Sequence, residues 1–234
     1  MQLQIFCSKV SNAHIPDGFI DLPTSLAFTA VSTAAVGVAL KQAKNELSEK
    51  TAPLAGLTAV FIFAVQMLNF PVAAGTSGHL LGGALAAVLV GPWVATLALT
   101  IVLLLQALLF ADGGLTALGL NVFNISILAV WIAYFIFLTL KKILPKTKFS
   151  LIVSSAFAAL ISVPVSAFGF WVQYAIGGNA TFPLETVLTA MISTHILIGI
   201  GEAIITVLTI SAIMASRSDL VFGWKNSRRK LVIN

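Results

Sequence analysis

Three histidines, His14, His79 and His195, are the side chains of this chain best suited to bind a metal ion. His79 lies in the stretch 69–83, NFPVAAGTSGHLLGG, where a proline and four glycines separate two apolar runs. Irregular backbone at membrane depth is tolerated only where it is buried in protein or lines a cavity. A histidine beside it is therefore a functional candidate. A helix break with a histidine satisfied by packing is the alternative.

His195 and Glu202 are seven residues apart in one apolar run, which places them on one face of a helix. Ionisable groups within a span usually face the bundle interior. They are either a relay that supports a metal site or a buried pair that fixes helix packing. Gly199 and Gly201 would allow close helix approach, so we favour the packing interpretation.

Several polar residues could support a ligating histidine through a hydrogen bond. Three asparagines can play this role or can bond one helix to another: Asn69, Asn121 and Asn124. Ser77, with Thr76, could cap a helix that starts at His79. Asp112, in a glycine-rich turn, could attract cations or cap the helix that follows.

The composition is that of a multi-pass protein of the cell membrane. Of 234 residues, 59% are hydrophobic and 9% are charged, whereas soluble domains carry about 25% charged residues. The single cysteine, Cys7, excludes an intrachain disulfide and a cysteine-rich metal site. The net charge is +5, and the basic residues are clustered in a few loops. This clustering is typical of a membrane protein's topology and does not indicate nucleic-acid binding. We therefore expect an all-α membrane fold.

Six apolar runs predict spanning helices, which need roughly 20 residues each: 22–40, 54–70, 93–110, 115–140, 150–176 and 184–215. The shorter run 80–90, followed by Gly91-Pro92, predicts a seventh helix. A re-entrant hairpin within 79–110 is the alternative.

The positive charges predict the orientation of these helices. Of the 13 Lys and Arg residues, all except Lys9 fall within 41–50, 141–148 or 217–230. The positive-inside rule then places the N-terminus outside and the C-terminus in the cytoplasm. It also requires an even number of crossings between residues 71 and 111. His14, the 69–83 stretch and the loops at 112 and 177–183 would then share the outer face.

Four motifs in this chain resemble a known family. They are HIPDGF at 14–19, GTSGHLLGG at 75–83, DGGLTALGLNVFN at 112–124 and THILIGIGEAIIT at 194–206. In this order they are similar to CbiM, the substrate-specific membrane component of energy-coupling-factor cobalt importers, and to its nickel relative NikM. The resemblance extends from His14 to about Ala215. It implies capture of Co(II), or alternatively Ni(II), outside the membrane, for uses such as cobalamin biosynthesis.

The resemblance also implies a ligand set. In the family the mature chain begins Met-His-Ile, and its terminal amine, the second residue's amide and imidazole, and a histidine of the GTSGH loop supply four nitrogens. Carried over, the last three are the amide and imidazole of His14 and the imidazole of His79. Nitrogen donors in a square-planar array suit late first-row metals such as Ni(II) and Cu(II).

This sequence departs from that pattern before His14, where Ala13 replaces Met and twelve further residues precede it. An internal peptide nitrogen is not an amine. Residues 1–13 make a poor signal peptide, because the apolar piece is short and Lys9 lies on its wrong side. Either this segment is absent from the mature protein or another donor completes the site. Asp17 is an available oxygen donor, although it also suits a turn in IPDG.

We therefore divide the chain into an N-terminal extension (1–13), a transmembrane metal-binding domain (14–216) and a basic cytoplasmic tail (217–234) that meets membrane lipid. The resemblance implies three partners: a CbiQ-type transmembrane component, a CbiN-type small membrane subunit that is not fused here, and ATP-binding cassette ATPases. No Walker motif occurs, so other chains would hydrolyse ATP.

Two other functions remain open from the sequence. A vitamin-specific membrane subunit would need a pocket lined by aromatic and polar groups. A membrane metal enzyme would usually need three or more His or carboxylate ligands, and no HExxH motif or paired-carboxylate motif is present. We therefore expect a transport protein and not an enzyme.

Overall fold

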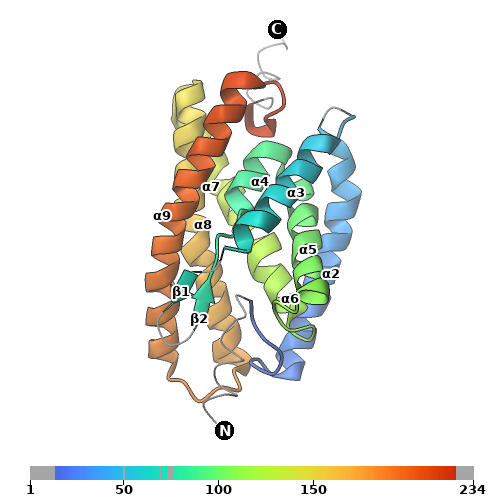
Figure 1. Cartoon of the computed structure of the whole chain (residues 1–234), viewed down its shortest axis with the longest axis vertical. Helices are drawn as coiled ribbons and strands as arrows, with labels where there is room; N and C mark the ends of the chain where they lie inside the picture. Colours follow the sequence, from blue (N-terminus) through green and yellow to red (C-terminus); the bar gives the residue numbers. More distant parts are fainter. Residues whose placement is uncertain (1–13, 50, 69, 73–75, 225–234) are drawn as a thin grey trace.

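The computed structural model describes residues 14–49, 51–68, 70–72 and 76–224. These residues form a bundle of helices with one short β-hairpin (Figure 1). The helical elements are α2 (Leu22–Gln42), η1 (Ala43–Asn45), α3 (Ala52–Gln66), α4 (Gly83–Val90), α5 (Pro92–Leu109), α6 (Leu118–Asn121), η3 (Val122–Ala129), α7 (Val130–Ile143), α8 (Lys148–Gly177) and α9 (Leu184–Ser216). The predicted helical membrane fold is confirmed.

Within the described part of the chain, five helical segments are long and apolar enough to cross a membrane. They are Leu22–Asn45, Pro92–Leu109, Leu118–Ile143, Lys148–Gly177 and Leu184–Ser216. The third joins α6, the π-helical segment η3 and α7 into one rod. α3 is apolar but has only 15 residues.

The short helix α4 is the centre of the bundle. Each of its eight residues is buried, and it packs against α3, α5, α7, α8 and α9. A Cβ on Gly83 would lie 3.2 Å from the backbone of Ala129, so a glycine permits the close approach of α4 to η3. At about 1.5 Å per residue, eight residues are too few to cross a bilayer.

The chain reverses direction between α4 and α5. Gly91 has φ 94°, in the left-handed region that favours glycine, and Pro92 then begins α5. The helix break predicted at Gly91-Pro92 is therefore present. Glu46, after η1, accepts a hydrogen bond at Oε2 from the Val94 amide at 2.9 Å, in the first turn of α5.

The β-hairpin consists of β1 (Phe70–Val72) and β2 (Thr76–Gly78), which pair antiparallel. After β2 the backbone stays irregular until Gly82, whose φ of 79° precedes α4. The expectation that a helix starts at His79 is therefore wrong: α4 begins at Gly83, and no side chain caps it. Asn69 lies outside the described residues.

The connections at the N-terminal end of the bundle bind to one another. Ile20 forms an isolated bridge with Gly178, and the Asp21 amide donates to the Gly177 carbonyl at 2.6 Å. The connections α2–α3 and α7–α8, which carry lysines, lie at the opposite end with the end of α9 (Figure 1). The molecule thus has one end rich in lysine and one end that contains the HIPDGF, DGG and 177–183 segments.

Candidate metal site

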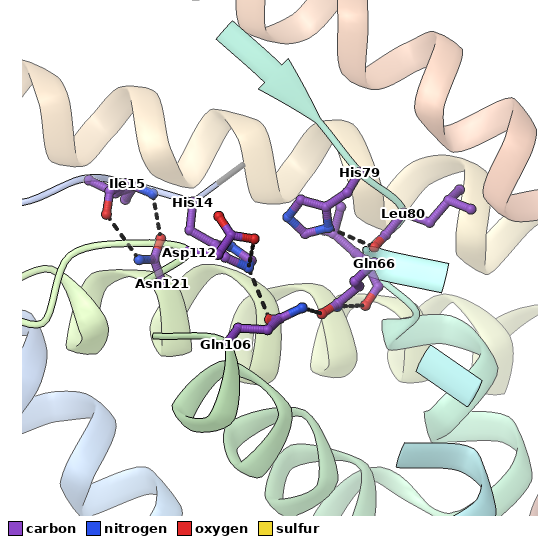
Figure 2. A network of polar contacts seen from close by, with 9 residues as sticks. His14, Ile15, Gln66, His79, Leu80, Gln106, Asp112 and Asn121 are labelled. Carbon is purple, nitrogen blue, oxygen red and sulfur yellow. Dashed lines mark hydrogen bonds and ion pairs between the residues drawn. The ribbon is translucent and has the colours of Figure 1, made fainter. Parts of the chain in front are cut away.

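His14 and His79, 65 positions apart in the chain, meet inside the bundle. Their ring centroids are 4.5 Å apart with an interplanar angle of 70°, and their residues are only 5% and 4% exposed. Figure 2 shows the two rings between the end of α5 and the start of α4. The structure therefore brings together the two histidines that the motifs indicated.

The segment around His14 is held by the turn that follows α5. The Ile15 amide donates to Asn121 Oδ1 at 3.0 Å, and Asn121 Nδ2 donates back to the Ile15 carbonyl at 3.3 Å. Gly113, with φ 94°, leaves no room for a side chain, because a Cβ there would lie 2.8 Å from the Cβ of His14. Asn121 thus fixes the backbone next to His14 and does not bond the imidazole itself.

Asp17 ties the same two segments together on the surface. Its Oδ1 accepts hydrogen bonds from the Thr116 amide at 2.8 Å and from the Thr116 hydroxyl. These bonds, mainly that of the hydroxyl, hold the pKa of the Asp17 carboxyl below its ordinary value. Asp17 therefore fixes the turn after α5, and its bonded oxygen is not directed to the histidine pair.

Hydrogen bonds occupy one ring nitrogen of each histidine. His14 Nε2 lies 3.0 Å from Gln106 Oε1, and His79 Nδ1 lies 2.8 Å from the Leu80 carbonyl oxygen. Because both oxygens are acceptors, both nitrogens must carry the proton when the rings are neutral. His14 Nδ1 is buried and has no hydrogen-bond partner among the described residues.

Burial keeps both rings neutral at physiological pH. It lowers the pKa of His14 to about 4, against the opposing effect of the bond to Gln106. Burial, with the neighbouring His14 ring, lowers the pKa of His79 to about 3. Asp112 Oδ2 lies 3.8 Å from His14 Nε2 and also favours a proton on that nitrogen. A neutral imidazole with one unprotonated nitrogen is the form that binds metals.

The donor set suits a metal held by few side chains. No cluster of three or more His, Cys, Asp or Glu that could hold a metal ion occurs in the described ranges. Two imidazoles fill two positions of a coordination shell, so other donors would complete it. In any histidine, one ion bound by both the amide nitrogen and Nδ1 closes a six-membered chelate ring.

The other predicted residues lie farther from the pair. Asn124 is directed toward α8, where its Nδ2 donates to Gln173 Oε1 at 2.8 Å. Half-buried His195 is bonded through Nδ1 to the Met191 carbonyl at 2.7 Å within α9. Glu202 accepts from the Leu81 amide at 2.7 Å, two residues beyond His79. Ser77 lies on β2.

Two glutamines that the sequence analysis did not select are central to the site. Gln106 bonds His14, and its Nε2 donates to Gln66 Oε1 at 3.0 Å. Gln66 Nε2 donates in turn to the Leu81 carbonyl at 2.8 Å (Figure 2). Each glutamine is an amide side chain inside an otherwise apolar run, and this could have indicated its role. Such a group needs a hydrogen-bond partner when it is buried.

Comparison with known proteins shows the family of this chain. The profile of the family CbiM, "Cobalt uptake substrate-specific transmembrane region", matches residues 14–220. A protein of Archaeoglobus fulgidus, provisionally named the fused nickel transport protein NikMN, is 36% identical over 89% of this chain and 68% of its own length. The cobalt transport protein CbiM of Acetohalobium arabaticum is 27% identical over 91% of this chain and 86% of its own length.

Solved structures give the same result. The crystal structure of a transition metal transporter superposes with a TM-score of 0.80 at 28% identity, over 94% of this chain and 99% of that one. The crystal structure of a truncated transition metal transporter superposes with a TM-score of 0.78 at 30% identity. The match covers 86% of this chain and 98% of that one. The chain belongs to the CbiM family of substrate-specific transmembrane proteins.

Proposed function

We propose that this protein captures Co(II), or alternatively Ni(II), as the substrate-binding subunit of an energy-coupling-factor importer. The observation that carries the proposal is the pair of buried, neutral imidazoles of His14 and His79, in which Nδ1 of His14 has no hydrogen-bond partner among the described residues. Relatives in the same family carry the names of cobalt and nickel transport proteins, which supports this cargo.

The proposed ligands are nitrogens of the N-terminal segment and of His79. His14 would contribute Nδ1 and its amide nitrogen, which loses its proton on binding. His79 would contribute Nε2, and an amine one residue before His14 the fourth donor. An all-nitrogen, tetragonal set suits Ni(II), and the family resemblance implies nearly the same donors for Co(II). The two metals share this chemistry, so the site geometry supports both.

The proposed orientation places the site on the outer side of the membrane. The lysine-bearing connections lie together at the opposite end of the bundle (Figure 1), as the positive-inside rule requires for the cytoplasmic end. Seven crossings are proposed. α3 and α4 are too short to cross alone, and the buried, irregular residues 79–82 extend the path of α4 through the membrane. α4 and α5 together give the even number of crossings that the charges demand.

The proposed complex contains separate subunits for energy coupling. The NikMN protein of Rhodobacter capsulatus, 31% identical over 89% of this chain, is named as a fused nickel transport protein. This supports a CbiN-type small subunit as a partner of the CbiM-like region. A CbiQ-type transmembrane component and ATP-binding cassette ATPases are proposed from the family resemblance.

A competition titration of the purified protein with Co(II), Ni(II) and Mg(II) tests the proposal. We expect one tight site for Co(II) or Ni(II) and none for Mg(II), which prefers oxygen donors. A protein that binds neither transition metal but retains a vitamin would support the vitamin-specific alternative. Turnover of a substrate by the metal-loaded protein would support the enzyme alternative.

A further inference from the structure

A chain of buried amide side chains connects His14 to the backbone before α4. Gln106 on α5 and Gln66 at the end of α3 are 0% and 1% exposed. Three successive hydrogen bonds of 3.0, 3.0 and 2.8 Å join His14, Gln106, Gln66 and the Leu81 carbonyl. Figure 2 shows this chain running from the imidazole to the start of α4.

The Leu81 carbonyl fixes the direction of every bond in this chain. A carbonyl oxygen can only accept, so Gln66 must present its NH₂ group to Leu81 and its oxygen to Gln106. Gln106 must then present its NH₂ group to Gln66 and its oxygen to His14. The nitrogen that meets this oxygen, His14 Nε2, must donate, and the proton of the neutral ring is held there.

We propose that Gln66 and Gln106 are positioning residues of the metal site, which hold His14 as the Nε2–H tautomer and so reserve Nδ1 for the metal ion. This inference rests on the proposed function. Nδ1 is the ring nitrogen that can close a six-membered chelate with the amide nitrogen of the same residue. In the opposite tautomer a proton occupies Nδ1, and this chelate cannot form without a shift of that proton.

The surroundings of His14 fit this role. Nδ1 is buried, and none of the described residues forms a hydrogen bond to it. Asp112, 3.8 Å from Nε2, places negative charge beside the proton. If the two glutamines only stabilised the fold, their hydrogen-bond chain would not need to terminate at His14 Nε2, the ring nitrogen that cannot form the six-membered chelate.

The same backbone segment fixes the second histidine in the opposite tautomer. The Leu80 carbonyl accepts from His79 Nδ1 at 2.8 Å, so the lone pair of His79 lies on Nε2. The amide of Leu81, in the same peptide group, donates to Glu202 Oε2 at 2.7 Å. Glu202 of α9 thereby anchors the segment on which both tautomers depend.

The test is Gln66→Leu, a change that does not touch His14. In metal-free protein labelled with ¹⁵N-histidine, NMR identifies which ring nitrogen carries the proton, and His14→Ala assigns the signal. We expect wild-type His14 to be Nε2–H and the variant to show a mixture of tautomers. The affinity for Co(II) or Ni(II) should fall by about 10–100-fold, as with other partners of ligating histidines.

Gln173→Leu is the matched control, because Gln173 is also 0% exposed and bonded to an amide, that of Asn124 on η3. It should leave the tautomer of His14 and the metal affinity unchanged. Gln106→Glu is a second probe in case Gln66→Leu does not fold. Its carboxylate still accepts from Nε2–H, so the wild-type tautomer should persist.

Three results would overturn the inference. The first is an unchanged His14 tautomer in Gln66→Leu, and the second is an Nδ1–H tautomer in wild type or in Gln106→Glu. The third is an equal loss of metal affinity in Gln66→Leu and Gln173→Leu. The NMR measurement needs no metal. A wild-type protein with the expected tautomer that bound no metal would therefore contradict the proposed function and leave the tautomer assignment standing.

Discussion

His14 and His79 are proposed to bind the metal as neutral rings whose unprotonated nitrogens differ, Nδ1 in His14 and Nε2 in His79. Each is neutral because it is buried, and each is oriented because its second nitrogen meets an oxygen acceptor. His195 differs from this pair. It is bonded within its own helix and only half-buried, although it lies close enough to His79 to influence that ring electrostatically.

This contrast predicts different effects for two alanine variants. His79→Ala should abolish high-affinity binding of Co(II) or Ni(II), because it removes a ligand, while the protein stays folded. His195→Ala should reduce thermal stability or transport more than metal affinity. Titration and thermal unfolding of both variants provide the measurements, and equal weakening of metal binding would show that His195 is not structural.

The amine proposed before His14 gives a second prediction at this scale. A chain that begins at Ala13 should bind metal much more tightly than one that begins at Met1, because its free amine, amide and imidazole lie in one short segment. Competition titration of both forms is the measurement. Equal affinities would mean that a terminal amine is not a ligand here.

The pH dependence of this difference identifies the amine. An amine has an ordinary pKa of about 7.7–8.0 and must lose its proton to bind metal. The advantage of the Ala13 form should therefore shrink as the pH falls below about 8. The imidazoles should not contribute over that range, since burial lowers their pKa values to about 4 and about 3.

At the scale of elements, Glu46 links the end of η1 to the start of α5. Its carboxylate meets the Val94 amide, and a Cβ on Gly91 would lie 2.6 Å from its Cδ. Burial raises the pKa of Glu46 to about 7, against the opposing effect of hydrogen bonds from the amides of Val94 and Trp93. The carboxyl therefore holds its proton more tightly in the folded protein than in the unfolded chain.

The sign of this shift predicts a pH-dependent stability. Because the folded pKa exceeds the ordinary value of 4.5, Glu46 lowers stability as the pH rises from about 4.5 through about 7. Glu46→Gln keeps an acceptor oxygen and removes the charge. Its melting temperature relative to wild type should rise by about 2–4 °C between about pH 5 and pH 8, for an effect of ~1 kcal/mol after allowance for solvent screening.

Thermal unfolding of the purified protein at both pH values measures this difference. Glu49→Gln is the matched control, because Glu49 is exposed in the same connection. It should follow the wild-type melting temperature across the pH range. A constant difference between Glu46→Gln and wild type would contradict the assigned shift.

The helices were largely predictable, and the polar contacts between them were not. The apolar run 150–176 corresponds to α8, Lys148–Gly177, because the length of an apolar run limits a spanning helix. The start of α4 was misplaced because a left-handed Gly82 is not visible in composition. Gln66 and Gln106, 40 residues apart, become partners only after α3 and α5 pack together.

In the candidate site, too, some features could be predicted from the sequence and others could not. The motif resemblance indicated His14 and His79, which the structure brings together, and Asn121, chosen as a possible support for an imidazole, bonds the backbone of Ile15. Asn124, only three residues later, faces α8 instead. The π-helical turns that begin at Val122 change the direction of the side chains that follow. No pattern in the sequence predicts these π-helical turns.

At the scale of the whole molecule, the two ends of the bundle have different chemistry. At one end, the N-terminal segment that carries His14 meets the α5–α6 and α8–α9 connections (Figure 1). The lysine-bearing connections form the other end. The proposed importer, which captures its cargo outside and releases it inside, needs two such different ends.

Cysteine labelling of intact cells tests that orientation. With Cys7 replaced by serine, Thr181→Cys should react with a membrane-impermeant maleimide added outside, because Thr181 is exposed between α8 and α9. Lys146→Cys, exposed between α7 and α8, should react only after the membrane is opened. Labelling of position 146 in intact cells would reverse the topology and place the metal site on the cytoplasmic side.

X-ray absorption spectroscopy of the protein loaded with Ni(II) or Co(II) tests the central claim most directly, because it identifies the atoms bound to the metal. The account predicts a shell of nitrogen donors that includes two imidazoles in wild type and one in His79→Ala at high metal concentration. His195→Ala should give the wild-type spectrum. A shell dominated by oxygen, or a spectrum that His79→Ala leaves unchanged, would contradict metal capture by the histidine pair.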